Sequence, residues 1–324
     1  MAKINMVQAI NEAIKSEMAR DKKVLIMGED VGVDGGVFRV TDGLSTQFGP
    51  NRVIDTPLAE AGIIGTAVGL AINGMKPIVE MQFIGFSYEG FHHINHHVGR
   101  MRQRSEGSVS CPIVLRGPSG GGIKALELHS ESPETFFIHS QGIKVICPSN
   151  PYDAKGLMIS AIRDPDPVIF LEPEKLYRSF KDEVPEESFT VPIGEAKVVR
   201  TGKDVTIVSW GAMVRLCLDV AEQLKDKVDI EIIDLRTLWP LDEDKIIESV
   251  KKTGRAVIVH EAPRTGGYGG EIASRIQEKG ILYLQSPVIR VTGFDVPYPQ
   301  FALEEYYLPN AERVIKGINS VMNF

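Results

Sequence analysis

The sequence predicts an α/β protein made of two doubly wound domains, and three observations support this prediction. In the first half, short apolar runs alternate with helical segments, which is typical of a parallel sheet covered on both faces. The alternation stops in a charged, proline-containing stretch at 176–203 and begins again at 204. The length of 324 residues is also sufficient for two hydrophobic cores.

The first half begins with an expected amphipathic helix, because Met6, Ile10, Ile14 and Met18 recur along one stripe. Strands are then expected at 23–30, 76–83, 111–118, 143–149 and 166–173, and helices at 59–72, 87–104 and 151–164. For the last helix, Ser149 or Asn150 can act as the N-cap, and Pro151 suits the first turn.

The stretch 176–203 is interpreted as a linker with one short extended segment. Beyond it, strands are expected at 204–213, 229–237, 255–263 and 288–293, and helices at 214–226, 242–254, 269–279 and 310–322. This order predicts a second α/β domain of doubly wound type.

Composition argues against several functions and locations. The net charge is −7, so no basic face for nucleic acid is expected. Apolar runs end well short of about 18 residues, so no membrane span is expected. The N-terminus lacks a signal-peptide core, and Cys111, Cys147 and Cys217 lie in apolar surroundings. Reduced core thiols and a cytoplasmic location are therefore expected.

Glu60 precedes a segment, AGIIGTAVGLAING, that contains no charged residue. A helix that is apolar on every side is expected to be buried, and the carboxylate at its start with it. A buried carboxylate must find a partner or change its pKa. Glu60 could therefore be satisfied by the backbone N–H groups and dipole of its helix, or could hydrogen-bond a ring nitrogen of a cofactor.

A glycine-rich loop at 116–134 follows an expected strand and contains His129. Its glycines indicate a tight turn or a close approach to a ligand, although a simple surface loop is the alternative. The loop matches neither the Walker phosphate loop nor a GxGxxG turn.

Four histidines occur in the segment FHHINHHVGR. The pairs His92/His96 and His93/His97 have i,i+4 spacing, which can hold zinc, but no further ligand completes the set. A polar helix face or a subunit contact is the favoured interpretation.

Nearly the whole chain resembles one enzyme family in the order and spacing of its motifs. The motifs are GEDVG, DTPLAEAGI, EMQF, RGPSGGG, HSESPE, IKVICPSNPYDAKGL, DPVIFLEP, IDLRTLWPLD and HEAPRTGG. Together they resemble the β subunit of the thiamine diphosphate-dependent E1 component of 2-oxo acid dehydrogenase complexes. The resemblance implies a pyrimidine-type thiamine diphosphate-binding domain at 1–180, a linker at 181–203 and a transketolase C-terminal-like domain at 204–324.

The resemblance also implies roles for individual residues. Glu60 falls at the position of the glutamate that hydrogen-bonds N1′ of the cofactor's aminopyrimidine ring and favours the imino tautomer that forms the ylid. Phe86 falls at the aromatic position that stacks on the pyrimidine, and Gln82 at a position lining the same pocket. His129 matches the family's active-site histidine, as a general acid or base or as an oxyanion stabiliser.

The remaining ligands of the cofactor are expected on another chain. Thiamine enzymes hold Mg²⁺ and the diphosphate with a GDG motif followed by asparagine, and VDGG and TDG here do not match it. The resemblance therefore implies an α subunit in an α₂β₂ heterotetramer. It also implies a K⁺ ion in this chain, bound largely by backbone carbonyls at Ile113, Ala161, Ile162, Asp164 and Asp166. Relatives often have asparagine where Asp166 stands here.

The expected substrate is a branched-chain 2-oxo acid, because HSESPETFF, FLEPEKLYR and HEAPRTGG look more like branched-chain enzymes than pyruvate enzymes. The acyl group would pass to a lipoyl-bearing E2 acyltransferase, whose basic subunit-binding domain could dock near Phe324. One alternative is the β subunit of a pyruvate or acetoin dehydrogenase. Another is a catalytically silent assembly subunit, against which the retention of Glu60, Phe86 and His129 argues.

Overall fold

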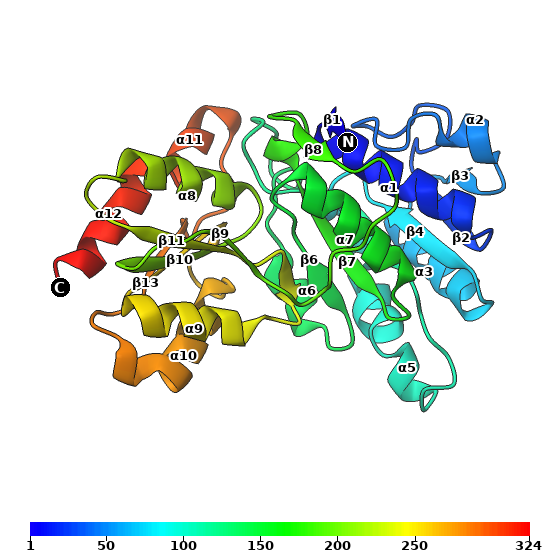
Figure 1. Cartoon of the computed structure of the whole chain (residues 1–324). Coiled ribbons are helices and arrows are strands. Elements are labelled where there is room, and N and C mark those ends of the chain that lie inside the picture. The colour runs from blue at the N-terminus through cyan, green and yellow to red at the C-terminus, as the bar shows by residue number, and fades with distance from the viewer.

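The computed structural model describes residues 1–324, and Figure 1 shows two lobes, each built around its own sheet. The strands are β1 (Ala2–Ile4), β2 (Val24–Gly28), β3 (Val53–Asp55), β4 (Lys76–Glu80), β5 (Val114–Ser119), β6 (Lys144–Ile146), β7 (Val168–Pro173), β8 (Asp182–Val184), β9 (Lys197–Arg200), β10 (Val205–Ser209), β11 (Ile230–Asp234), β12 (Thr237–Trp239), β13 (Ala256–Pro263) and β14 (Ile289–Gly293). The first domain has a seven-stranded sheet in the order β12-β6-β7-β5-β4-β2-β3, and the second a five-stranded sheet in the order β14-β13-β10-β11-β9.

The helices surround these two sheets. They are α1 (Met6–Arg20), α2 (Leu44–Phe48), α3 (Glu60–Ile72), α4 (Phe91–His93), α5 (Met101–Arg104), α6 (Glu134–His139), α7 (Pro151–Arg163), α8 (Ala212–Gln223), α9 (Glu243–Thr253), α10 (Gly269–Gly280), α11 (Glu304–Tyr307) and α12 (Ala311–Met322). The 3₁₀-helices are η1 (Ile84–Gly90), η3 (Glu174–Leu176), η4 (Ile281–Tyr283) and η5 (Phe301–Leu303), and η2 (Ile94–Val98) is a π-helical turn.

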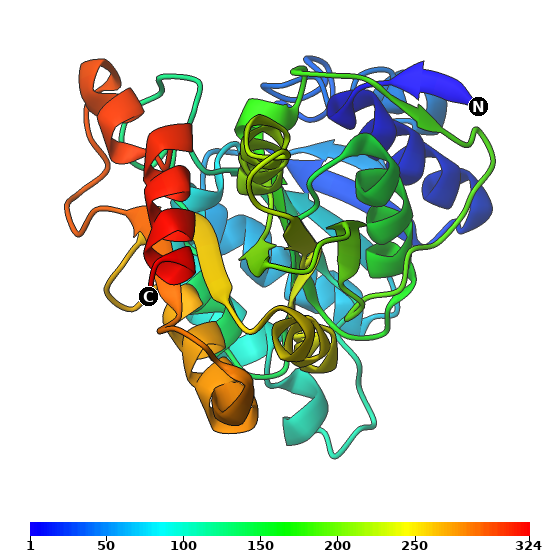
Figure 2. The same ribbon diagram turned by 60° about the vertical axis from the view of Figure 1, so that its left-hand side comes forward.

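Each sheet is covered on both faces, which confirms the doubly wound architecture. In the first domain, Ile26 and Ile78 belong to the core under α1 and α7, whereas Met27 and Val79 belong to the core under α3. In the second domain, α8 and α12 lie on one face and α9 and α10 on the other, as Figures 1 and 2 show. Burial on both faces explains why these strands are continuously apolar.

The expected helix at 87–104 is wrong. The segment is broken into η1, α4, η2 and α5, and no side chain caps any of these pieces. Gly90 and Gly99 interrupt it, and glycine costs about 1 kcal/mol relative to alanine inside a helix. The other helices that the sequence predicted are present, with ends that differ by a few residues.

The chain crosses between the domains more often than its periodicity predicted. Within the expected linker, β8 pairs with β1, and β9 forms an antiparallel edge of the second sheet. Farther along, β12 pairs antiparallel with β6 and extends the sheet of the first domain. Backbone hydrogen bonds therefore tie the two domains together.

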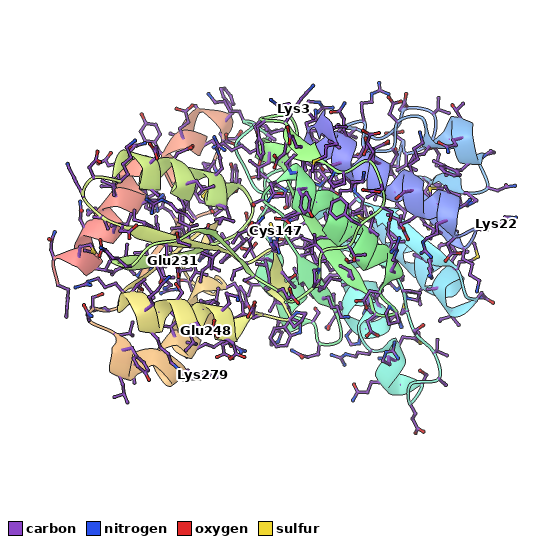
Figure 3. All side chains as sticks on the ribbon, viewed as in Figure 1. Lys3, Lys22, Cys147, Glu231, Glu248 and Lys279 are labelled. Atoms are coloured by element: carbon purple, nitrogen blue, oxygen red, sulfur yellow. The ribbon has the colours of Figure 1, made fainter.

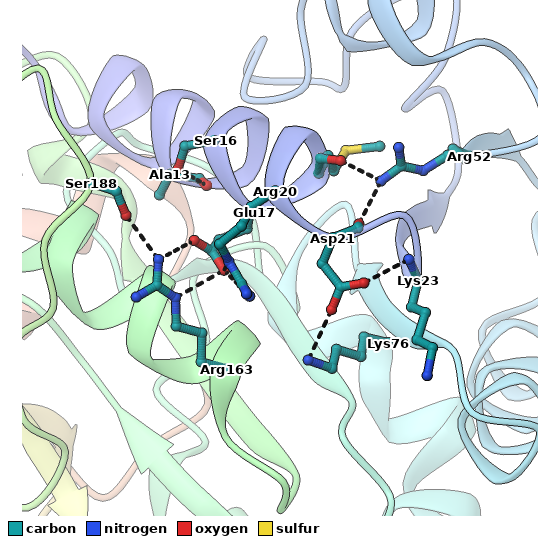
Figure 4. Close-up of polar contacts among 11 residues, drawn as sticks. Ala13, Ser16, Glu17, Arg20, Asp21, Lys23, Arg52, Lys76, Arg163 and Ser188 are labelled. Carbon is teal, nitrogen blue, oxygen red and sulfur yellow. Dashed lines mark hydrogen bonds and ion pairs between the residues drawn. The ribbon is translucent and has the colours of Figure 1, made fainter.

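A buried charge network joins α1 to α7. The Glu17 carboxylate is fully buried and accepts hydrogen bonds from Arg163 at 2.6 Å and from Arg20 at 2.6 Å, as Figure 4 shows. Burial opposes ionisation of Glu17, but the two guanidinium groups hold its pKa below the usual value. Because removing one partner of a buried pair leaves an uncompensated charge, these contacts specify how the two helices pack.

Helix α3 differs from its expected environment. Its residues Ile63, Ile64 and Ala67 are buried, but Gly62, Thr66, Gly69 and Ile72 form an exposed stripe. Glu60, at the first position, is half-buried rather than buried. Apolar composition therefore predicted burial on a face that nothing in this chain covers.

A small cavity lies at the junction between the domains. The cavity, of about 30 Å³, is lined by Glu134 and Cys147 of the first domain and by Trp210 and Glu261 of the second. Figure 3 labels Cys147 at this junction. Cys111, Cys147 and Cys217 are all buried and unpaired, which confirms the expected core thiols. No helix has the length and apolar character needed to cross a membrane.

Candidate active site

The sheet order of the first domain changes direction at β2. The chain passes from β2 outward to β3 and then returns to β4 on the other side of β2. In open α/β sheets such a reversal leaves a crevice at the carboxyl ends of the strands, where ligands bind. Glu29 and Asp30 directly follow β2, and Gln82 lies two residues beyond β4.

A group of acidic side chains gathers at this edge. Glu29 is buried, and its pKa is raised by burial first, then by the negative charges of Glu60 and Asp30. Glu60 begins α3, and no side chain caps this helix. The Gln82 amide donates to Asp30 Oδ2 at 3.0 Å. The structure thus brings the predicted residues Glu60 and Gln82 to one acidic edge and adds Glu29 of the GEDVG motif, a carboxylate that follows a fully apolar strand.

Aromatic rings form the second part of the site. The His129 imidazole lies 4.4 Å from the Phe83 ring and 5.1 Å from the Phe86 ring, measured between ring centroids. Phe38 extends the cluster with an edge-to-face contact to Phe83 at 5.5 Å. The structure therefore places the predicted residues Phe86 and His129 in contact, although they are far apart in the sequence. Phe38 and Phe83 were not predicted, because an isolated phenylalanine has no local signal.

Two glycines allow these elements to approach closely. A Cβ at Gly85 would overlap the carbonyl oxygen of Leu128, next to His129. A Cβ at Gly90 would overlap the Ile64 side chain and lie 3.2 Å from the carbonyl oxygen of Glu60. Gly85 and Gly90 hence hold Phe86 between the His129 loop and the start of α3.

The expected cation-site residues cluster at the opposite end of the sheet. Ala161 and Ile162 form the last turn of α7, and Ile113 precedes β5, where its carbonyl accepts the Val168 N–H at 2.9 Å. The Asp164 carboxylate pairs with Lys144 at 2.6 Å. The Asp166 carboxylate pairs with Arg102 at 2.5 Å. Both carboxylates therefore already have basic partners, so the prediction of a cation site depends on the backbone carbonyls.

The histidine cluster is compact but makes no complete metal centre. The His92 and His96 rings stack at 4.8 Å, and the His93 and His97 rings lie 5.4 Å apart. No group of three or more His, Cys, Asp or Glu side chains is arranged to hold a metal ion. A polar face or a subunit contact remains the prediction for these residues.

Comparison with known proteins identifies the family. The family model described as "Transketolase, pyrimidine binding domain" matches residues 2–179, and the one described as "Transketolase, C-terminal domain" matches residues 194–314. A pyruvate dehydrogenase E1 component subunit beta from Staphylococcus epidermidis is 50% identical over 325 residues, covering 100% of both chains. The chain belongs to the family of E1 β subunits of 2-oxo acid dehydrogenases. The corresponding subunit from Staphylococcus aureus strain COL is also 50% identical with the same coverage.

The fold agrees with this family. A solved structure described as "Split gene transketolase, inactive beta4 tetramer" is similar with a TM-score of 0.81 and covers 99% of both chains. Its sequence identity is 22%, so it supports the fold alone.

The relatives do not support the expected branched-chain substrate, because those named here are pyruvate enzymes. The motifs behind that expectation have a physical explanation. Glu134 of HSESPE and Glu261 of HEAP line the cavity at the domain junction, as does Pro173 at the end of FLEP. These motifs therefore reflect the packing between the two domains more than the shape of a pocket for the substrate side chain.

Proposed function

We propose that this chain, with an α subunit, catalyses the thiamine diphosphate-dependent oxidative decarboxylation of pyruvate and acyl transfer to a lipoyl-bearing E2 acyltransferase. The observation that supports the site is the contact between Phe86 and His129 near the carboxyl-end crevice of the sheet, where the Glu60 carboxylate acts on the buried Glu29. The relatives named as pyruvate dehydrogenase subunits support the substrate.

The residues at this edge fit the pyrimidine half of the cofactor. When bound, thiamine diphosphate supplies the carbon nucleophile and the electron sink for decarboxylation. Glu60 would share a proton with a ring nitrogen of the pyrimidine. The buried Glu29 provides a second carboxyl group close to Glu60. Phe86 offers a ring face for stacking. His129 would hold or release a proton near the substrate carboxylate or the lipoyl group.

The α partner is proposed for the rest of the site. The exposed stripe Gly62, Thr66, Gly69 and Ile72 runs along α3, the helix that Glu60 begins, and its mostly small side chains are suited to close packing by another subunit. In an α₂β₂ heterotetramer, ligands for Mg²⁺ and the diphosphate would come from the α chain. The exposed Phe324 is a proposed contact for the E2 protein, and the cytoplasm is the proposed location.

The substrate and the partner are tested together. The tagged chain is isolated with its partner from its own host, and dye reduction is measured with thiamine diphosphate, Mg²⁺ and either pyruvate or a branched-chain 2-oxo acid. We expect a co-purifying chain with a GDG motif and a kcat/KM at least about tenfold higher for pyruvate, since a few methylene groups change discrimination by about 10–200-fold.

Faster turnover of the branched-chain acid would reverse the substrate assignment. Activity without any partner chain would contradict the shared site. An assembled but inactive complex, supplied with both acids, would favour the silent assembly subunit.

We also propose a K⁺ ion at Ile113, Ala161, Ile162, Asp164 and Asp166. The carbonyl groups of the last turn of α7 carry partial negative charge, which favours a cation. We expect KCl to raise the unfolding temperature above that in NaCl or choline chloride at equal ionic strength. Binding at 100 times Kd would add about 2.7 kcal/mol of stability. Equal unfolding temperatures in the three salts would contradict the site.

A further inference from the structure

A backbone hydrogen bond joins the ends of loop 120–131, and near one end Leu128 and His129 contact Gly85, Phe83 and Phe86 of the first domain. The Gly120 N–H donates to the Glu131 carbonyl at 2.8 Å. Between them, Lys124 and Leu128 adopt left-handed conformations with φ of 62° and 65°. Such conformations are unfavourable for residues with a Cβ and persist where the surroundings impose them. The central part of the loop therefore needs contacts from outside.

Two carboxylates of the second domain supply these contacts. The Gly121 N–H donates to Glu261 Oε2 at 2.9 Å, and the Lys124 N–H donates to both carboxylate oxygens of Glu304 at 3.1 Å. Glu261 lies on β13 and Glu304 on α11. The Tyr298 hydroxyl orients Glu304 by donating to its Oε2 at 2.8 Å.

The fit between loop and carboxylates is close. A Cβ at Gly120 would lie 2.6 Å from Glu261 Oε2, and one at Gly121 would overlap the Tyr298 hydroxyl. Glycine at these two positions lets the backbone reach the second domain.

Burying a carboxylate at these two positions is energetically unfavourable. Glu304 is 2% exposed, and the pKa of Glu261 is raised to about 7, mainly by burial. Their hydrogen-bond donors are backbone N–H groups and a tyrosine rather than basic side chains. Lys175 acts on Glu261 only through its charge, and Glu261 is half-buried. Because carboxylates that lack a hydrogen-bonded basic partner are generally costly to bury, their hydrogen bonds to the loop backbone indicate a task beyond packing.

We propose that Glu261 and Glu304 are positioning residues, which hold loop 120–131 so that His129 stays against Phe83 and Phe86. This inference rests on the role of His129 in the proposed function. A misplacement of about 1 Å in a reacting group can cost about 100-fold in rate. Releasing the loop would therefore lower turnover while Glu60 and Phe86 remain able to bind the cofactor.

The experiment uses the complete complex with its α partner. Hydrogen–deuterium exchange is measured for peptides covering 120–131 and for β10 and β11, together with kcat, KM for pyruvate and thiamine diphosphate affinity. The variants are Glu261→Ala, Glu304→Ala, His129→Ala and the conservative Glu261→Gln, which keeps an acceptor for the Gly121 N–H. The matched control is Glu305→Ala, because Glu305 is exposed and pairs only with the Lys124 ammonium at 3.2 Å.

We expect both glutamate-to-alanine variants to speed exchange in the loop by about tenfold, with β10 and β11 unchanged. We expect kcat to fall by about 10- to 100-fold at unchanged thiamine diphosphate affinity. Glu261→Gln should restore both the loop exchange and kcat, and Glu305→Ala should match the unmodified complex. If Glu261→Ala does not fold, loop exchange and kcat are compared between Glu304→Ala and Glu261→Gln instead.

Several results would overturn the inference. Unchanged loop exchange in Glu304→Ala, or a glutamine variant as impaired as the alanine variant, would show that the two carboxylates do not anchor the loop. A slow His129→Ala complex beside a fast Glu261→Ala complex would overturn the positioning role alone. Full turnover in both would overturn the role of His129 in the proposed function, and the positioning role with it.

Discussion

Replacing Glu60 with glutamine is expected to lower kcat by about 100- to 10,000-fold, the range contributed by a positioned proton-transfer group. Glutamine has nearly the same shape but cannot share a carboxyl proton with a ring nitrogen of the cofactor. Because Glu60 is half-buried at the start of α3, the change should leave the fold and the assembly with the α subunit intact.

The loss is measured as thiamine-dependent dye reduction by the assembled complex, with subunit composition checked by size-exclusion chromatography. Glu248→Gln is the matched control, since Glu248 is an exposed glutamate on α9 of the other domain. Full activity of Glu60→Gln would refute the role proposed for Glu60. A failure to assemble would instead assign Glu60 to the subunit interface.

Replacing Arg116 with methionine is expected to destabilise the first domain by about 3–5 kcal/mol, the usual cost of leaving a buried charge unpaired. Arg116 is buried on β5 and pairs with Glu80 of β4 and Glu172 of β7. The Tyr177 hydroxyl completes the network by donating to Glu172 Oε2 at 2.5 Å. Burial raises the pKa of Glu80 to about 7, although the positive charge of Arg116 opposes the shift. The ionised form of Glu80 therefore depends on Arg116.

The change is measured as the urea midpoint of the first-domain transition. Arg102→Met is the control, because Arg102 forms a more exposed pair with Asp166 and such pairs contribute about 0–1 kcal/mol. Adding Glu80→Gln and Glu172→Gln to Arg116→Met should recover part of the loss, since no buried charge would then lack a partner. A loss below about 1 kcal/mol for Arg116→Met alone would contradict the role given to this network.

The site was only partly predictable from sequence. Glu60 and His129 have local signals, a carboxylate before an uncharged helix and a histidine in a glycine-rich loop, whereas Phe86 and Gln82 were assigned through the family resemblance. Glu29, Phe38 and Phe83 were not predicted. Their importance comes from neighbours that the strand order brings together, and strand order is a long-range property.

By itself, the sequence determined the alternation of strands and helices, the amphipathic helix α1 and the division into two doubly wound domains. These features depend on the spacing of apolar residues within one element, so they can be recognised locally. It also correctly indicated buried, unpaired cysteines, because their neighbours in the chain are apolar.

Only the tertiary structure decided which apolar faces are covered and which distant groups meet. It left the stripe of Gly62, Thr66 and Gly69 exposed, added β12 to the sheet of the first domain, and placed Glu261 and Glu304 beneath the loop of His129. The apolar composition of a surface determines how unfavourable its exposure to water is, but it does not determine which partner covers it. Hydrogen bonds between residues 140 and 180 positions apart depend on the packing of whole domains, and no local pattern encodes them.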